Sequence, residues 1–274
     1  MIGQRVLKEQ VNIWKQENSL PKFLIVQGIE GSGKKTLLAH IAKQFGMPLL
    51  YFANKMEGVR ELIDVCYNQS RKIMYAIADV DKMSGTAENA LLKIAEEPPT
   101  NAYIAITSCS DTLLPTIKSR GVTVVMESYT QKDKEEYVDK VLDLDVDDVL
   151  REEMELSDTL YDISVFERCD FSRLKKLCEN IVEKIKKANT GSALCISQNI
   201  SVKETDNAQE DKFDLGLFLK VLSKSFYDKY MKTRERLYYN SYAHILNAKK
   251  QLQRSFNKSY ILDELLLKLQ GSCV

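Results

Sequence analysis

The chain has 274 residues, enough for two or three domains that each bury a core. Its 39 Lys and Arg residues balance 39 Asp and Glu residues, which disfavours a nucleic-acid binder that is basic throughout. No apolar run approaches the ~20 residues that a membrane helix needs, and the first residues lack a signal-peptide core. We therefore expect a cytoplasmic protein with no membrane partner.

The first predicted elements are a helix over residues 4–18 and a strand from Phe23 to Val26. A glycine-rich turn and a second helix follow, because the apolar spacing becomes helical after the turn. This turn has the Gly-x-x-x-x-Gly-Lys pattern of a phosphate-binding P-loop. Its N–H groups and the helix N-terminus would face an anion, and Lys34 would reach a terminal phosphate.

Seven residues of the turn and helix start are the expected nucleotide-binding set: Gly28, Gly31, Ser32, Gly33, Lys34, Lys35 and Thr36. ATP or ADP would be the cofactor. Lys35 stands where the motif has a Ser or Thr hydroxyl that coordinates magnesium, and an ammonium cannot ligate a metal. We therefore do not expect magnesium here. A second interpretation is that the loop kept its shape and lost its chemistry.

Strands and helices alternate as far as residue 126. We predict strands over 48–52, 73–78, 102–107 and 122–126, and helices over 58–67, 87–95 and 113–119. Two of these strands, 73–78 and 102–107, are continuously apolar runs, as in strands buried on both faces. The alternation predicts an α/β fold, a parallel sheet with helices on both faces.

The composition changes after the sheet. All five prolines lie at or before Pro115, and only three glycines follow Gly121. Without these breakers the chain can stay helical, so we predict helices over 131–187 and 213–269. Residues 201–212 are polar and aperiodic, which indicates a linker or exposed loop. We therefore expect domains over residues 1–128, 129–200 and 201–274.

The cysteine spacing does not favour a metal site. The six cysteines form no Cys-x-x-Cys pair, and the two histidines, His40 and His244, are not near a cysteine in sequence. We therefore expect free thiols and no zinc or other metal.

Five segments of the first domain match one family in order and spacing. They are Val59-Arg60-Glu61-Leu62, Asp81-Lys82-Met83, Asn89-Ala90-Leu91-Leu92-Lys93, Glu96-Glu97-Pro98-Pro99 and Leu113-Leu114-Pro115-Thr116-Ile117-Lys118-Ser119-Arg120. They resemble the clamp-loader AAA+ subunits, above all the delta-prime subunit of bacterial DNA polymerase III. The resemblance implies a P-loop AAA+ domain, a small helical lid and an all-helical C-terminal collar for oligomerisation. The four-cysteine zinc module of many such subunits is absent, since the corresponding interval holds only Cys66.

The resemblance also implies roles for single residues. Arg120 matches the arginine of the Ser-Arg-Cys motif, which reaches into the ATP site of a neighbouring subunit; Gly121 replaces the cysteine. A guanidinium suits the charge of a transferring phosphoryl group. Thr107 matches the sensor-1 region, where a polar side chain would orient water. Arg173 could match the sensor-2 arginine of the lid, or be an ordinary surface residue.

The acidic motif separates an enzyme from a non-enzyme. An active site of this type needs two adjacent carboxylates, one for magnesium and one to polarise water. Here Asp79 is the single carboxylate, with Ala78 before it and Val80 after it. Together with Lys35, this removes two parts of the hydrolytic apparatus, so turnover in cis is not expected.

The leading hypothesis is a clamp-loader subunit without ATPase activity of its own. It would supply Arg120 in trans, join the other clamp-loader subunits of a hetero-oligomer through its C-terminal helices, and help to load a sliding clamp on primed DNA. The alternative is an active AAA+ ATPase, a motor subunit or helicase-loader-like protein. A third interpretation is a scaffold that binds nucleotide without cleaving it.

Direct DNA contact is a separate hypothesis. A basic aromatic segment near the C-terminus interleaves lysine and arginine with aromatic residues: Lys220, Lys224, Phe226, Tyr227, Lys229, Tyr230, Lys232, Arg234 and Arg236. Such a segment could bind DNA, or its charges could serve solubility alone.

Overall fold

The computed structural model describes residues 1–109, 113–184, 214–253 and 257–271. The chain forms two units: Met1–Asp145 with Asp158–Tyr161, and Val146–Ser157 with Asp162–Val274. In the described ranges, no helix has the length and apolarity that a membrane span requires. The predicted boundary between residues 200 and 201 lies outside the described residues, so the division into three domains stays a prediction.

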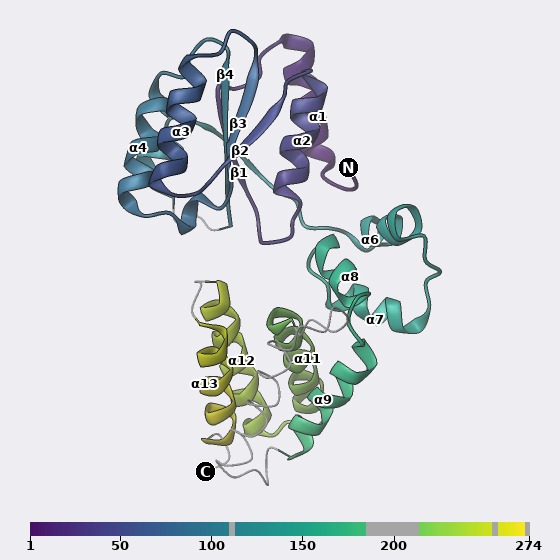
Figure 1. The fold of residues 1–274 in the computed structure, drawn as a ribbon. Coiled ribbons are helices and arrows are strands. Elements are labelled where there is room, and N and C mark those ends of the chain that lie inside the picture. Colours follow the sequence, from purple (N-terminus) through teal and green to yellow (C-terminus); the bar gives the residue numbers. More distant parts are fainter. Residues whose placement is uncertain (110–112, 185–213, 254–256, 272–274) are drawn as a thin grey trace. The chain divides into compact units, whose positions relative to one another are not determined.

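The first unit is built on one parallel sheet (Figure 1). Its strands stand in the order β2-β3-β4-β1-β5, and each neighbouring pair is parallel. The elements are α1 (Arg5–Glu17), β1 (Phe23–Gln27), α2 (Lys34–Gln44), β2 (Leu49–Phe52), α3 (Met56–Tyr67), β3 (Ile73–Ile77), η1 (Val80–Lys82), α4 (Gly85–Glu96), β4 (Ala102–Ser108), α5 (Pro115–Lys118), β5 (Val122–Val125), α6 (Gln131–Tyr137) and the π-helical η2 (Val138–Leu142). The predicted parallel α/β fold is confirmed.

Helices cover both faces of this sheet, α1 and α2 on one side and α3 and α4 on the other (Figure 1). Successive strand residues point to opposite faces, so both cores draw on the same strands. Phe23 and Ile25 belong to the core under α3 and α4, whereas Leu24 and Val26 belong to the core under α1 and α2. The continuous apolar runs of the sequence follow from this double burial.

The strand register brings the P-loop and two other segments of this unit to one edge of the sheet. Gln27, the last residue of β1, lies opposite Ser108 of β4 and Val125 of β5. Because these strands are parallel, the P-loop after β1 shares one edge of the sheet with the segments that follow β4 and β5. Ligands of open α/β sheets bind at this carboxyl edge.

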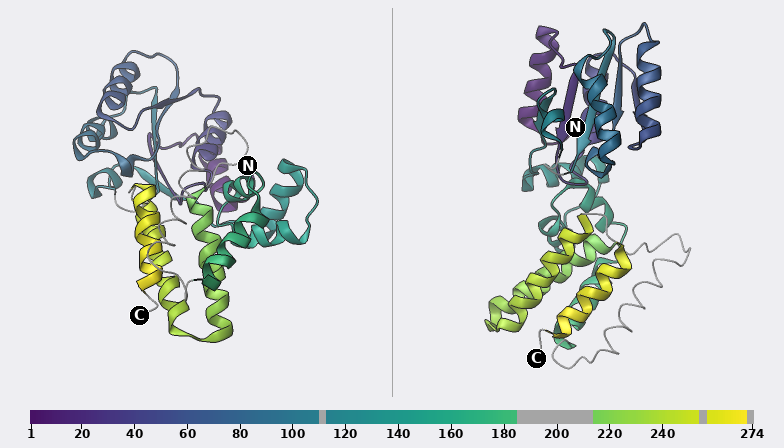
Figure 2. Two further views of the ribbon diagram at one scale, coloured as in Figure 1. Left: turned by 60° about the horizontal axis from the view of Figure 1, so that its bottom comes forward. Right: turned by 90° about the vertical axis from the view of Figure 1, so that its left-hand side faces the viewer.

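The second unit is helical throughout its described residues, as predicted. Its helices are α7 (Asp148–Leu156), α8 (Leu160–Phe166, whose first residues belong to the first unit), α9 (Phe171–Lys184), α11 (Leu215–Thr233), α12 (Arg236–Gln253) and α13 (Lys258–Gly271). Helices α11 and α12 pack closely along each other as a hairpin (Figure 2). The predicted linker over 201–212 lies outside the described residues.

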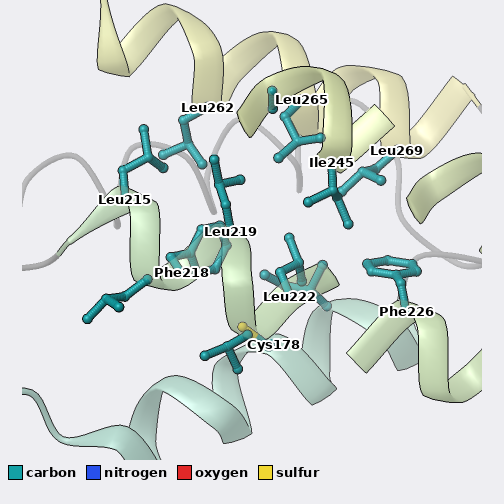
Figure 3. Close-up of a cluster of buried hydrophobic side chains, with 14 of the residues drawn as sticks. Cys178, Leu215, Phe218, Leu219, Leu222, Phe226, Ile245, Leu262, Leu265 and Leu269 are labelled. Carbon is teal, nitrogen blue, oxygen red and sulfur yellow. The ribbon is translucent and has the colours of Figure 1, made fainter. Parts of the chain in front are cut away.

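The core of the second unit forms where α9, α12 and α13 pack around α11 (Figure 3). Phe218, Leu222 and Phe226 follow one another at helical spacing on α11, and each is fully buried. Ile245 of α12 and Leu265 of α13 pack into the same cluster. Burial of this kind, rather than intrinsic propensity, provides most of the stability of a helical domain.

A carboxyl group is buried in the second unit. Glu153 of α7 is only 6% exposed. Burial, followed by repulsion from Asp147, Glu167 and Glu152, raises the pKa of the Glu153 carboxyl from 4.5 to about 7. The folded state therefore holds a proton on Glu153 in a pH range where the unfolded chain has released it.

This difference predicts a pH-dependent stability. Between the two pKa values the unfolded state binds fewer protons, so the free energy of unfolding falls as the pH rises towards 7. We expect Glu153→Gln to remove this slope and to add about 1–3 kcal/mol near pH 8. Urea unfolding, monitored by the far-UV circular dichroism of the helices over about pH 5–8, measures the free energy of unfolding at each pH. The exposed Glu155→Gln is the matched control, and equal slopes in the two variants would contradict the prediction.

Candidate functional site

The P-loop depends on glycine at two positions. Gly33 caps the start of α2 with a φ of 86°, a left-handed conformation that disfavours side chains, and no side chain caps the helix there. A Cβ at Gly28 would lie 2.7 Å from both the Cβ of Met126 and the Oγ of Ser32. The loop is therefore packed against the end of β5, and the N-terminus of α2 has the geometry of an anion site.

Lys34 is folded into its own loop. Its side chain is 7% exposed, and its Nζ donates to the carbonyls of Gly28 at 2.7 Å and Ile29 at 2.9 Å. The same Nζ lies 3.3 Å from the Sγ of Cys109, which follows β4. A phosphate in the loop would compete with these partners for the ammonium.

A cavity of about 280 Å³ opens beside the loop. It is lined by Gln27, Gly28, Ile29, Ser32, Cys109, Val125, Met126, Glu127, Ser128, Tyr129, Asp158 and Thr159. The buried Ser32 Oγ has no hydrogen-bond partner among the described residues. Such an orphaned hydroxyl at a helix N-terminus, with the glycine cradle, fits a phosphate oxygen. The cavity is slightly smaller than usual small-molecule sites.

Tyr129 closes one wall of this cavity. Its hydroxyl donates to the Ser32 carbonyl at 2.9 Å, and burial raises its pKa. No sequence pattern predicts this contact, because Tyr129 lies far from the loop in the chain and reaches it only through the pairing of β5 with β1. Asp158 and Thr159 also line the cavity, and no sequence pattern predicts this either.

Lys35 and Thr36 do not join the cavity lining. Both are exposed on α2. The Lys35 ammonium lies 5.9 Å from the ring centroid of Tyr51 on the edge strand β2. No group of three or more His, Cys, Asp or Glu residues in the described ranges has the geometry to hold a metal. The position that normally supplies a metal-binding hydroxyl thus carries a cation directed at an aromatic ring.

Asp79 and Thr107 meet at the carboxyl edge of the sheet. Asp79 has a φ of 53°, and its N–H donates to the Thr107 Oγ1 at 3.0 Å. Thr107 is fully buried on β4. The Asp79 carboxylate lies 3.7 Å from the thiol of Cys109. The backbone N–H of Cys109 donates to the Asp81 carboxylate at 3.0 Å. The Thr107 hydroxyl therefore holds the backbone of the acidic segment; its role in orienting water stays a prediction.

Arg120 lies at the surface at the end of α5. Its guanidinium pairs with the Glu96 carboxylate at the end of α4 and donates to the Thr116 carbonyl at 2.7 Å. The side chain is 32% exposed, so it is not enclosed in its own domain. The next residue is a glycine because there is little room for a side chain: a Cβ at Gly121 would lie 2.7 Å from a ring carbon of Phe23.

The register separates Arg120 from its own P-loop. Leu24 lies opposite Val122 and Gln27 opposite Val125 in the parallel pair β1 and β5. The P-loop leaves β1 after Gln27, whereas Arg120 comes before Val122. The two therefore lie at opposite edges of the sheet, with about 10 Å of strand between them.

Arg173 lies elsewhere. It is exposed in the first turn of α9, where its N–H donates to Asp170 at 2.9 Å. It belongs to the second unit and the P-loop to the first. Its role as a sensor-2 arginine stays a prediction.

Known proteins match both the sequence and the fold of this chain. Residues 53–130 match the family model described as DNA polymerase III, delta subunit. A DNA polymerase III gamma subunit-related protein of Thermotoga maritima has the same fold, with a TM-score of 0.58 and 16% identity over 97% of this chain and 100% of that one. The family model covers less than a third of this chain, and the structural match supports a clamp-loader-like fold. The residues matched by the family model include Asp79, Thr107 and Arg120 but not the P-loop.

One further solved structure and one further sequence are similar to this chain. The RuvB Holliday junction branch migration motor of Thermotoga maritima superposes with a TM-score of 0.50 and 19% identity, over 84% of this chain and 78% of RuvB. The uncharacterized protein MG007 homolog of Mycoplasma pneumoniae is 37% identical over 81 residues, 28% of this chain and 32% of that protein. The match thus spans about a third of that relative's length.

The contact between Thr107 and Asp79 can be tested by stability. Thr107→Val keeps the side-chain shape but leaves the Asp79 N–H without its acceptor, which should lower the free energy of unfolding by about 1–3 kcal/mol. Thr107→Ser keeps the hydroxyl and should lose less. Urea unfolding of the three proteins measures this. Equal stability of the Val variant and the parent would show that the hydrogen bond is not needed.

Proposed function

We propose that the chain is a clamp-loader subunit of the replicative DNA polymerase, of the delta-prime type, which does not hydrolyse ATP itself. It supplies Arg120 to the ATP site of a neighbouring subunit. The observation that supports this most directly is the position of Arg120 at the edge of the sheet opposite its own P-loop. A guanidinium at that edge can reach a nucleotide only on another molecule.

The environment of Arg120 suits such a role. A planar, permanently charged guanidinium can bind phosphoryl oxygens with two N–H groups at once. In the free subunit its partners are a carboxylate that is itself half exposed, Glu96, and the Thr116 carbonyl. Surface ion pairs of this kind contribute less than about 1 kcal/mol, so exchange of Glu96 for a nucleotide phosphate costs little.

The chain's own loop supports the absence of hydrolysis. Lys35 replaces the metal-binding hydroxyl and lies towards Tyr51. Asp79 is followed by the buried apolar Val80, so the second carboxylate is missing. The loop still fits a phosphate group, through Ser32, the glycines and Lys34. We therefore propose that it binds ATP or ADP, if at all, as a structural ligand without magnesium.

The proposed partners follow from the same assignment. The C-terminal helices would join the chain to other clamp-loader subunits, and the assembled complex would open a sliding clamp and place it on primed DNA. The matched gamma subunit-related protein carries the name of the same polymerase, and its structure spans nearly all of this chain.

Arg120→Ala tests the role in trans. In a complex reconstituted with the cognate motor subunits and clamp, it should lower DNA-stimulated ATP hydrolysis by about a thousandfold at the site it serves, the usual effect of an arginine finger. The matched control is Arg71→Ala, an exposed arginine just before β3 and thus at the same edge of the sheet. Size-exclusion chromatography checks that both variants assemble. Unchanged hydrolysis with Arg120→Ala in an intact complex would refute the role.

The isolated chain separates this proposal from an active AAA+ ATPase. We expect no ATP turnover above background with magnesium, because two catalytic groups are missing. Nucleotide binding without cleavage would appear as thermal stabilisation, about 2.7 kcal/mol when the ligand is at ~100 times its Kd. Sustained turnover that Lys34→Ala abolishes would instead establish the active ATPase.

A further inference from the structure

The α11–α12 hairpin is basic although the chain is neutral. Between Leu215 and Gln253 the sequence has eight Lys or Arg residues and two acidic ones, Asp228 and Glu235. Helix α12 contains no acidic residue at all. Such an excess of cations on one supersecondary element is the electrostatic feature of a polyanion-binding surface.

Part of this charge is already balanced within the second unit. Lys220 pairs with Asp162 at 2.6 Å. Three lysines, Lys224, Lys229 and Lys232, line a groove of about 390 Å³ together with the acidic Glu152, Glu179, Glu183 and Asp228. The cations that matter for a ligand are therefore those on the other side of the hairpin.

That side carries four tyrosines in two pairs that join the helices. Tyr227 of α11 lies 5.7 Å from Tyr242 of α12, and Tyr230 lies 5.6 Å from Tyr239, both between ring centroids. The rings are tilted by about 50° in each pair. We call these four residues the tyrosine face.

Two rings of the tyrosine face remain open to solvent. Tyr227 is 43% exposed and Tyr239 is 54% exposed. Their paired partners are partly buried and hold them in place, so the open rings are supported rather than free to turn. Fixed, exposed aromatic rings lose little conformational entropy when a planar ligand stacks on them.

Two exposed arginines lie at the end of the tyrosine face that is next to the turn between the helices. Arg236 lies one helical turn before Tyr239 on α12, so the two residues are neighbours on one face of the helix. Arg234 is exposed in the turn between the helices, with its guanidinium carbon 5.7 Å from the Tyr230 ring centroid. Lys249, near the other end of α12, instead donates to the Ser223 Oγ of α11 at 2.8 Å, so it belongs to the contact between the two helices.

We propose that the tyrosine face binds single-stranded DNA. Unpaired bases stack on Tyr227 and Tyr239, while Arg234 and Arg236 contact phosphates. Stacking requires bases whose faces are accessible, which selects single strands over duplex. The choice of DNA over RNA rests on the proposed function in DNA replication; the tyrosine pairs and the cations stand independently of it.

Fluorescence anisotropy with the full chain and a fluorescein-labelled oligothymidylate tests the proposal at low salt. Tyr239→Leu removes the ring but keeps an apolar helix former, and should raise the Kd by about 5- to 150-fold. Tyr239→Phe keeps the ring and should bind as the parent does. Tyr260→Leu, which removes a 62% exposed tyrosine from α13, is the matched control and should have no effect.

The electrostatic part has its own readout. Arg236→Gln should make the slope of log K against log salt concentration shallower by about 0.7, the contribution of one phosphate contact to a single strand. Lys258→Gln on α13 is the control for charge. An oligonucleotide of the same length without bases should bind the parent protein as weakly as the normal oligonucleotide binds Tyr239→Leu.

Several results would overturn the proposal. One is that the oligonucleotide does not bind at low salt, and another is that the double variant Tyr227→Leu with Tyr239→Leu binds it as tightly as the parent does. The others are that the parent binds the oligonucleotide without bases as tightly as the normal one, or binds duplex DNA or RNA more tightly than single-stranded DNA. Loss of subunit assembly in Tyr239→Leu with unchanged DNA binding would assign the face to a protein partner instead. No nucleotide or ATPase partner is present in these assays, so failure of the Arg120 role leaves their outcome unaffected.

Discussion

The parallel pairing of β1 with β4 and β5 is the constraint on which the first unit depends. Because Gln27 stands opposite both Ser108 and Val125, one edge of the sheet collects the P-loop, Cys109 and Tyr129. The same pairing sends the chain before β5 to the other edge, where Arg120 lies. A single register therefore separates the P-loop from the Arg120 guanidinium, so the two do not meet at one nucleotide within one copy of the chain.

Polar groups at the carboxyl edge of the sheet have structural roles. The Asp79 backbone has a left-handed conformation that costs about 1–3 kcal/mol, and the hydrogen bond from its N–H to the Thr107 hydroxyl offsets part of this cost. The Lys34 ammonium satisfies two loop carbonyls that would be costly to leave unpaired. The Thr107 hydroxyl and the Lys34 ammonium thus have partners in the protein, whereas the Ser32 hydroxyl has none among the described residues.

The sequence predicted the elements of the sheet well and their contacts poorly. Strands buried on both faces appear as apolar runs, and the glycine pattern of the P-loop is local, so both can be read without a fold. The contacts of Tyr129 with Ser32 and of Lys34 with Cys109 join residues 97 and 75 positions apart, and they exist only because of the strand register. The pairing of Arg120 with Glu96 has the same origin. No local pattern encodes such contacts.

The charge of the α11–α12 hairpin likewise could not be assigned to a surface from the sequence alone. Interleaved lysines and tyrosines indicate a basic aromatic segment, but helical geometry distributes them over different faces. Lys224, Lys229 and Lys232 lie in a groove that four carboxylates share, whereas Tyr227 and Tyr230 meet α12 on the other side. The cations near the tyrosines come instead from the turn and from α12, a helix without acidic residues. The charge of a segment is therefore not the charge of any one of its surfaces, and a binding site can be assigned only when the helices have been paired.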